Sequence, residues 1–233
     1  MNTFFEGFLQ ALRLLIGLDP DVFEIISLSL RVSGVALAIS VALGLPLGAW
    51  LGLRRFRGRR LAVALLYTGM GLPPVVVGLT VYLLLSRQGP LGGLGWLFTS
   101  RAMIVAQVVL ALPLVAGFTM TALAAIPPEM TLQIRSLGAT PLQTHLTLLF
   151  EARAGVLAAI VAGFGAIISE VGSVMIVGGN IAHKTRVLTT AIVLETGKGN
   201  FDLAIALGII LLALAFGANW LILLLQGRLG PRP

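Results

Sequence analysis

The chain has 233 residues, of which 58% are hydrophobic and only 11% charged, and it carries a formal net charge of +7. A soluble domain has about 25% charged residues, so this composition excludes an ordinary soluble protein and indicates an integral membrane protein. The positive charge does not indicate nucleic-acid binding, because basic residues also collect in the cytoplasmic loops of membrane proteins.

Residues 1–31 are predicted to lie at the membrane interface. They combine phenylalanines and leucines with Glu6 and Arg13, which gives an amphipathic helix too short and too charged to span. The first ten residues lack the basic start of a signal peptide. Residues 19–21, Asp-Pro-Asp, are predicted to break the chain before the first span.

Five apolar stretches are predicted to cross the membrane. Each is long enough for a helix rising about 1.5 Å per residue to cross about 30 Å of hydrocarbon. The expected spans are residues 32–53, 61–86, 102–126, 154–177 and 203–225. Pro74 and its neighbours from Gly71 are expected to interrupt the second span, and Pro113 to kink the third. A short helix is expected at residues 188–196, between the last two spans.

The basic residues predict the orientation. Five arginines follow the first span within residues 54–60, and such loops stay in the cytoplasm. With this loop inside, the cytoplasmic segments hold nine basic and two acidic residues, whereas the outer segments hold seven basic and six acidic residues. The sequence therefore predicts an N-terminus outside and a C-terminus in the cytoplasm.

The polar interval at residues 127–153 is predicted to form a helical hairpin on the cytoplasmic side. Glycine accepts the left-handed backbone that often ends a helix, so Gly138 is expected to separate two short helices. Thr140 and Gln143 have the spacing of a capping box at the second helix. The exposed turn would consist of Arg135, Ser136, Leu137, Gly138, Ala139 and Thr140. A hairpin of this kind offers a surface to a partner protein.

This hairpin resembles the cytoplasmic loop of ABC-transporter permeases, in which Glu-Ala-Ala is followed by a glycine that matches Gly138. The sequence departs from the pattern at residues 132–134, which read Leu-Gln-Ile, and at residues 150–151, where Phe-Glu replaces Leu-Pro. The glycine and its neighbours Leu137 and Ala139 are retained.

Other segments are similar to the molybdate and tungstate branch of these permeases. Residues 72–92 and 102–117 look like this branch in general, and residues 169–212 resemble the tungstate permeases closely. Molybdate relatives tend to read Glu-Phe-Gly and Gly-Asn-Ile-Pro-Gly in the matching places. This chain instead has Glu-Val-Gly at residues 170–172 and Gly-Asn-Ile-Ala-His at residues 179–183.

The resemblance implies an all-α type I ABC importer permease with five transmembrane helices per subunit, in a prokaryotic cell membrane and in contact with lipid. Its partners would be a second copy of itself, two ATP-binding subunits and an extracytoplasmic oxyanion-binding protein. Its function would be the ATP-driven import of tungstate, with molybdate or another tetrahedral oxyanion as the alternative. The hairpin would dock on the ATPase. ATP and magnesium would bind that partner, so this chain would be neither an enzyme nor the carrier of a cofactor.

Several residues are candidates for the translocation pathway. Glu170 is the only acid within an expected span, and it is either a gate residue or an acid held by a neighbouring helix. The structural role is favoured, because a bare carboxylate repels an anionic substrate. Irregular backbone at membrane depth is tolerated beside a water-filled cavity, which favours the proline pair. The pathway candidates are Pro73, Pro74, Thr119, Ser169, Glu170 and Gly172, and the candidates for a basic outer mouth are Asn180, Lys184 and Arg186.

Catalytic and metal-binding patterns are missing from the sequence. It has no cysteine, and His145 and His183 are not at metal-ligand spacing. Residues 178–185 nearly match a phosphate-binding loop, but His183 replaces the second glycine and the segment is expected outside. A self-sufficient secondary transporter or channel is the competing class, and it would be supported by inverted repeats, which the sequence does not show. A membrane enzyme is the weakest alternative, for want of paired acids.

Overall fold

The computed structural model describes the backbone of residues 8–14, 17 and 19–229, and this part of the chain is helical without any strand. The helices in chain order are α2 (Pro20–Leu53), α3 (Arg59–Met70), α4 (Pro74–Leu85), the 3-10 helix η1 (Gly92–Leu94), α5 (Ser100–Ala124), α6 (Pro128–Ser136), α7 (Pro141–Glu151), α8 (Arg153–Ile168), α9 (Gly172–Gly178), α10 (Leu188–Gly197) and α11 (Phe201–Leu229). Residues 8–14 are also helical. The predicted all-α class is confirmed, and α10 lies where a short helix was expected.

Helix α2 is longer than the predicted first span. It begins at Pro20 rather than near residue 32, because the Asp19 carboxylate accepts hydrogen bonds from two backbone N–H groups of its first turn, both at 3.1 Å. The expected break at residues 19–21 is therefore a helix start. The later part of the expected interfacial segment belongs to α2, and residues 1–7, 15–16 and 18 of that segment lie outside the described residues.

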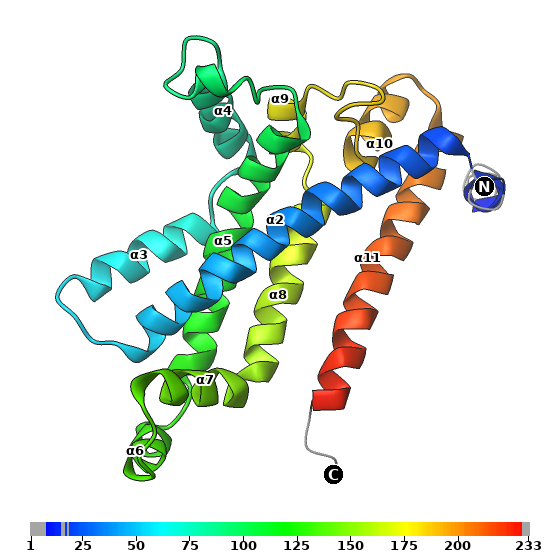
Figure 1. The fold of residues 1–233 in the computed structure, drawn as a ribbon. Helices are drawn as coiled ribbons and strands as arrows, with labels where there is room; N and C mark the ends of the chain where they lie inside the picture. The colour runs from blue at the N-terminus through cyan, green and yellow to red at the C-terminus, as the bar shows by residue number, and fades with distance from the viewer. Residues whose placement is uncertain (1–7, 15–16, 18, 230–233) are drawn as a thin grey trace.

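Helix α5 lies at the centre of the fold. Helices α2, α3, α4, α8 and α9 all pack against it, and α2 crosses it in the most extensive contact (Figure 1). Many of the buried side chains of α5 are small or β-branched, and Ala106, Ala111 and Val115 have no exposed surface. Pro113 lies within α5, which continues through it as one helix.

Three glycines of α2 explain why this helix approaches α5 so closely. Gly44, Gly48 and Gly52 recur every fourth residue, so they share one face of the helix. A Cβ atom on Gly44 would lie 3.0 Å from Val115, and one on Gly48 would overlap the backbone oxygen of Ala116. Small residues at this spacing let two membrane helices pack backbone against backbone.

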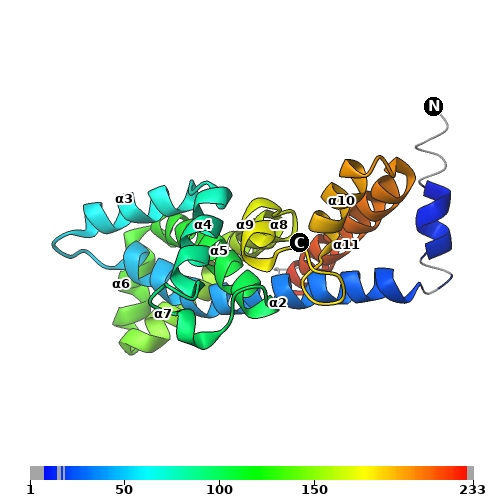
Figure 2. The ribbon, with the colours of Figure 1, turned by 90° about the horizontal axis from the view of Figure 1, so that it is seen from above.

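Helices α10 and α11 form a pair beside the main bundle. They pack on each other and on the start of α2, where Val22, Leu188, Ala191 and Leu207 share one apolar cluster. Seen from above, α2 extends from this pair to the group containing α3, α4 and α5 (Figure 2). Helix α2 therefore connects the two parts of the molecule.

Three of the described helices are long and apolar enough to cross a membrane: α2, α5 and residues Phe201–Leu221 of α11. The number rises to five if each of two bent pairs counts as one span, with α3 and α4 bent by 99° and α7 and α8 bent by 71°. The prediction of an interruption at Gly71–Pro74 is confirmed. The predicted fourth span, residues 154–177, is not one continuous helix, since the structure divides it into α8 and α9.

Candidate functional site

The hairpin has the local geometry that its sequence predicts. Gly138 lies between α6 and α7 with φ +84°, in the left-handed region, and its N–H donates to the carbonyl of Arg135 at 3.0 Å. The capping box is present, because the Thr140 hydroxyl accepts from the Gln143 N–H at 3.3 Å and the Gln143 side chain accepts from the Thr140 N–H at 2.8 Å. Leu137 at the turn is 87% exposed.

The hairpin packs on the rest of the protein through one side of each helix. Met130 and Ile134 of α6 pack on the inner apolar cluster. Leu137 lies in the exposed turn, as predicted, and on α7 it is Thr144 and Leu148, each 1% exposed, that face the protein. The apolar tip is therefore left uncovered, as a surface for a partner would be.

The break between α8 and α9 is held by hydrogen bonds from three directions. The Glu170 carboxylate accepts from the N–H of Ser173 at 2.9 Å, and the Glu170 carbonyl accepts from the hydroxyl of Thr189 on α10 at 2.9 Å. The Gln107 amide on α5 donates to the carbonyl of Ile167 in the last turn of α8 at 3.0 Å. Glu170 is buried and caps a helix, so its geometry is that of the favoured structural role.

Gln107 and Thr189 were not identified from the sequence. Both are buried, and both reach the break from helices that are distant in the chain. The available signal was the polar amide of Gln107 inside an apolar span, since such residues usually make functional or interhelical contacts. Thr189 gave no comparable signal, because threonine is ordinary in a short helix.

The two helix breaks lie next to each other. Helix α4 begins at the Pro73–Pro74 break and packs on α9, which begins at the Glu170 break. A Cβ atom on Gly172 would lie 3.0 Å from the Val75 side chain, and one on Gly78 would lie 2.7 Å from the Cα atom of Ser173. The structure thus brings Pro74 and Gly172 together, with Ser169 exposed at the same break.

Thr119 lies apart from these breaks. It has no exposed surface and faces α2. A Cβ atom built on Gly48 of α2 would lie 2.8 Å from the Cβ atom of Thr119. Its hydroxyl has no hydrogen-bond partner among the described residues.

The loop between α9 and α10 is closed by its own side chains. The Arg186 guanidinium donates to the Asn180 side chain at 3.3 Å and to its carbonyl at 3.4 Å. The Thr185 hydroxyl donates to the Gly178 carbonyl at 2.6 Å and accepts from the Ile181 N–H at 2.9 Å, so it is not free to hold a phosphate. Asn180 and Arg186 line a cavity of about 610 Å³ with Lys198. Lys184 is exposed and does not line it.

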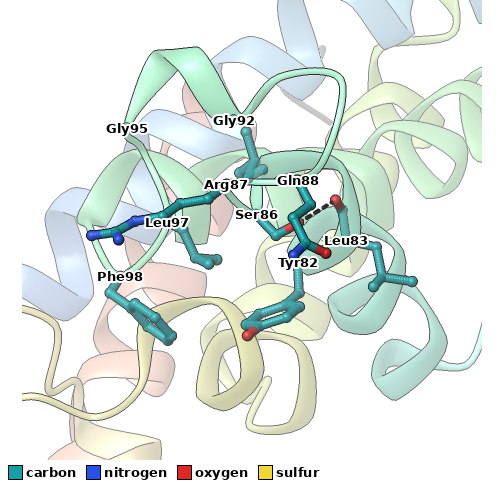
Figure 3. A pocket seen from close by; sticks show the side chains of 10 residues that line it. Tyr82, Leu83, Ser86, Arg87, Gln88, Gly92, Gly95, Leu97 and Phe98 are labelled. Atoms are coloured by element: carbon teal, nitrogen blue, oxygen red, sulfur yellow. Dashed lines mark hydrogen bonds between the residues drawn. The ribbon is translucent and has the colours of Figure 1, made fainter.

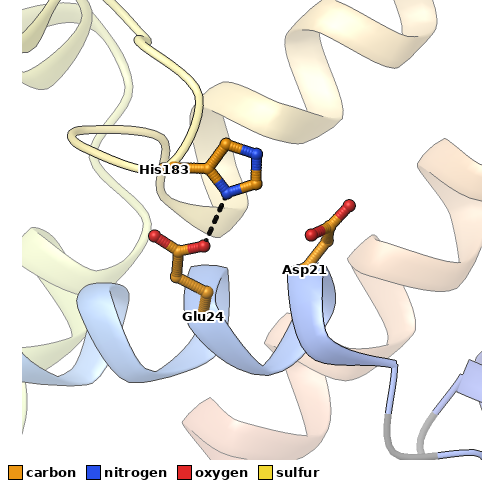
Figure 4. Close-up of side chains that lie close together, drawn as sticks. All are labelled: Asp21, Glu24 and His183. Carbon is orange, nitrogen blue, oxygen red and sulfur yellow. Dashed lines mark hydrogen bonds and ion pairs between the residues drawn. The ribbon is translucent and has the colours of Figure 1, made fainter.

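The same loop is tied to the start of α2. The His183 ring nitrogen Nδ1 lies 2.8 Å from the Glu24 carboxylate, and Asp21 lies on the other side of the ring (Figure 4). The hydrogen bond and charge of Glu24, with a smaller contribution from Asp21, raise the pKa of His183 above its ordinary value of 6.5. Protonation therefore strengthens a contact between two distant parts of the chain.

Another pocket is formed where α4 ends. It has a volume of about 690 Å³ and is lined by Tyr82, Ser86, Arg87, Gln88 and Phe98, among others (Figure 3). Tyr82 and Phe98 meet edge to face, with ring centroids 6.2 Å apart. The Arg87 and Gln88 side chains give this concave surface a polar and basic part.

Residues 44–231 match the protein family described as "Binding-protein-dependent transport system inner membrane component". The chain belongs to this family. The matched region covers most of the permease, from the second half of α2 onward. The expected family is confirmed, and the permease is the membrane subunit of an ABC transporter.

Two relatives are similar over most of the permease. A "Probable anion ABC transporter permease protein" of Haloferax volcanii is 47% identical over 201 residues, which cover 84% of this chain and 87% of the relative. The "Tungstate uptake system permease protein TupB" of Peptoclostridium acidaminophilum is 43% identical over 226 residues, which cover 97% of this chain and 99% of the relative.

The fold of the permease is that of type I ABC importer permeases. A solved bacterial alginate ABC transporter, in complex with alginate pentasaccharide-bound periplasmic protein, has a TM-score of 0.72 at 20% identity, over 93% of this chain and 84% of that chain. The hairpin of the permease keeps Gly138 at its turn even though residues 132–134 depart from Glu-Ala-Ala.

Proposed function

We propose that this permease carries a divalent tetrahedral oxyanion, tungstate, from an extracytoplasmic binding protein into the cytoplasm. The observation that carries the proposal is the 43% identity to a tungstate uptake permease along almost the whole chain. Two copies of the permease would form the pathway, and two separate ATP-binding subunits would drive it. Molybdate is the alternative substrate, and the experiment below distinguishes the two anions.

The chemistry of the two adjoining breaks suits an anion. The Glu170 carboxylate is already bonded to the Ser173 N–H, so it does not face the break as a free negative charge. Ser169 and the backbone around Pro73, Pro74 and Gly172 offer neutral polar groups, and neutral dipoles pass an anion with a low barrier. These residues are therefore the proposed gate, with Thr119 further away between α2 and α5.

In the proposed orientation, the outer and the cytoplasmic surfaces of the permease have different roles. The N-terminus and the α9–α10 loop would lie outside, where Lys184, Arg186 and Asn180 would attract the anion and the pocket at Arg87 would meet the binding protein. The hairpin would lie in the cytoplasm. There Leu137, with Arg135, Ser136, Gly138, Ala139 and Thr140 around it, would insert into the ATPase and transmit its movement.

Purification and uptake test this proposal together. A tagged permease isolated from its native membrane should retain a phosphate-loop ATPase. Proteoliposomes that contain this complex, with the binding protein outside, should accumulate tungstate only when ATP is present in their lumen. Competition by molybdate at equal affinity would make molybdate a substrate as well. Uptake driven by an ion gradient without ATP would identify a secondary transporter and overturn the proposal.

A further inference from the structure

Two adjoining pockets lie between the end of α2 and the hairpin. The first has a volume of about 290 Å³ and is lined by Arg54, Arg135, His145 and Thr144, among others. The second has a volume of about 370 Å³ and is an apolar groove that includes Leu45, Ala49, Trp50 and Leu146. Arg54 and His145 line both pockets, so the basic pocket and the apolar groove lie side by side.

The basic pocket has no negative charge of its own. Neither Glu129 nor Glu151, the acids of the hairpin, lines either pocket. Among the described residues, Arg54 and Arg135 make no ion pair. Two uncompensated guanidinium groups and an imidazole around one small space favour an anion, because guanidinium groups bind phosphate oxygens with charge-assisted hydrogen bonds.

The walls of both pockets are fixed by packing. Thr144 and Leu148 of α7 are each 1% exposed, and Leu148 packs with Ala49 of α2 in the inner apolar cluster. The groove runs on along α2, where Leu45 and Pro46 line it. This is the apolar part of a helix long enough to cross the membrane.

The surroundings have the chemistry of a membrane interface. Trp50 and Phe56 stack with ring centroids 4.3 Å apart, just where α2 ends. The Arg59 side chain donates to the carbonyl of Leu51 at 2.9 Å, and Arg153 lies 4.6 Å above the Phe150 ring. Aromatic and basic residues gather where the hydrocarbon meets the headgroups.

We propose that an anionic phospholipid of the cytoplasmic leaflet occupies both pockets. Its phosphate would bind Arg54 and His145, which line both pockets, and one acyl chain would lie in the groove between Leu45 and Leu146. Basic pockets between membrane helices on the cytoplasmic side are suited to anionic headgroups. An acidic side chain of a partner protein would fill the basic pocket but leave the groove empty. The proposal rests on the proposed orientation, which places this end of α2 in the cytoplasm.

The experiment is lipid retention by the full chain. The permease is reconstituted in nanodiscs of phosphatidylcholine with a minor share of phosphatidylglycerol, released, and analysed by native mass spectrometry. Arg54→Gln should lower the bound phosphatidylglycerol about fivefold, the effect of one basic residue at a membrane surface. Arg57→Gln is the matched control, because Arg57 is exposed in the same loop but lines neither pocket. Leu146→Asn tests the groove, and since Leu146 is 57% exposed the variant should fold.

Selective loss of phosphatidylglycerol in Arg54→Gln and Leu146→Asn, with retention in Arg57→Gln, would support the site. Equal loss in Arg54→Gln and Arg57→Gln would show only general surface attraction and would overturn it. Displacement of the lipid by inorganic phosphate, or binding unaffected by Leu146→Asn, would also overturn it in favour of a free anion. The assay contains no ATPase, binding protein or tungstate, so its result is independent of whether the permease imports tungstate.

Discussion

The Glu170 carboxylate accepts a hydrogen bond from the backbone N–H of Ser173 at 2.9 Å, across the break between α8 and α9. Within the expected spans, the one acidic side chain thus caps the helix that follows it. The hydroxyl of Thr189, on α10, donates a hydrogen bond to the backbone carbonyl of Glu170. The geometry of Glu170 is therefore that of a helix cap, in line with the structural role that the sequence favours.

Replacing Glu170 separates capping from charge. Glu170→Ala should lower the free energy of unfolding by about 1 kcal/mol, the usual effect of removing a helix cap. Glu170→Gln keeps an oxygen acceptor for the Ser173 N–H, so it should unfold within a few degrees of the parent protein and still transport. Thermal unfolding in detergent and tungstate uptake measure the two effects. A stable Glu170→Gln variant without transport would make the charge itself functional.

The close contact between α2 and α5 depends on Gly48. A methyl group there would overlap the carbonyl of Ala116, so Gly48→Ala should reduce the free energy of unfolding by about 1–3 kcal/mol, as overpacking does. Gly34→Ala is the control on the same helix, because a Cβ atom at Gly34 would have no neighbour within 4 Å. It should be neutral or stabilising, as alanine favours helix. Equal destabilisation by both variants would remove the role of close packing.

Local features of the hairpin were predictable from the sequence, whereas its packing was not. Gly138, Thr140 and Gln143 act through neighbours three residues away or fewer, so their spacing contains the information. The choice of buried face depends on where α2 and α5 lie. For that reason Leu148 of α7 is covered, whereas Leu146 two residues before it is 57% exposed.

The division of the fourth span was beyond the sequence for a similar reason. No proline marks the break, which depends on hydrogen bonds from Gln107 and Thr189, distant in the chain from Ile167 and Glu170. The break in the second span was predictable, because Pro73 and Pro74 restrict the backbone whatever the helix packs against. The early start of α2 could have been predicted from Asp19, which is a good N-cap residue. The Asp-Pro-Asp sequence at residues 19–21 was instead interpreted as a break before the first span.

The two basic residues of the loop between α9 and α10 should respond differently to salt. Lys184 is exposed, so Lys184→Gln should slow uptake at low ionic strength and have little effect near 0.15 M, where the Debye length is about 8 Å. Arg186 also holds Asn180 through two hydrogen bonds, so Arg186→Gln should reduce uptake at every salt concentration. Initial uptake rates across a salt series measure this. A salt-independent loss in Lys184→Gln would exclude electrostatic steering at that residue.

The contact between His183 and Glu24 should weaken as the pH rises. Since Glu24 and Asp21 raise the pKa of His183 in the folded protein, the contact contributes fully below pH 6.5 and is lost as the pH passes through the raised value. NMR of the labelled imidazole should give a midpoint above 6.5 in the parent protein. Glu24→Gln should shift that midpoint downward, and an unchanged midpoint would exclude Glu24 as the cause.

The hairpin turn is the most direct test of coupling. Gly138 has φ +84° and nothing lies within 4 Å of a Cβ atom built on it, so the effect of a substitution comes from the backbone alone. A β-branched residue in this conformation costs about 1–3 kcal/mol. The turn is exposed and far from the central helix contacts, so Gly138→Val should insert and fold while the position of Leu137 changes. It should lose ATPase binding, and with it the coupling of hydrolysis to uptake.

Gly138→Asn is the matched control, because asparagine tolerates the left-handed conformation better than other residues with a side chain. It should retain most ATPase binding and uptake. Co-purification of the ATPase and the ratio of ATP hydrolysed to tungstate imported measure the two variants side by side. If Gly138→Val binds the ATPase and transports like the parent protein, the hairpin does not couple the two activities, and another segment of the permease must do so.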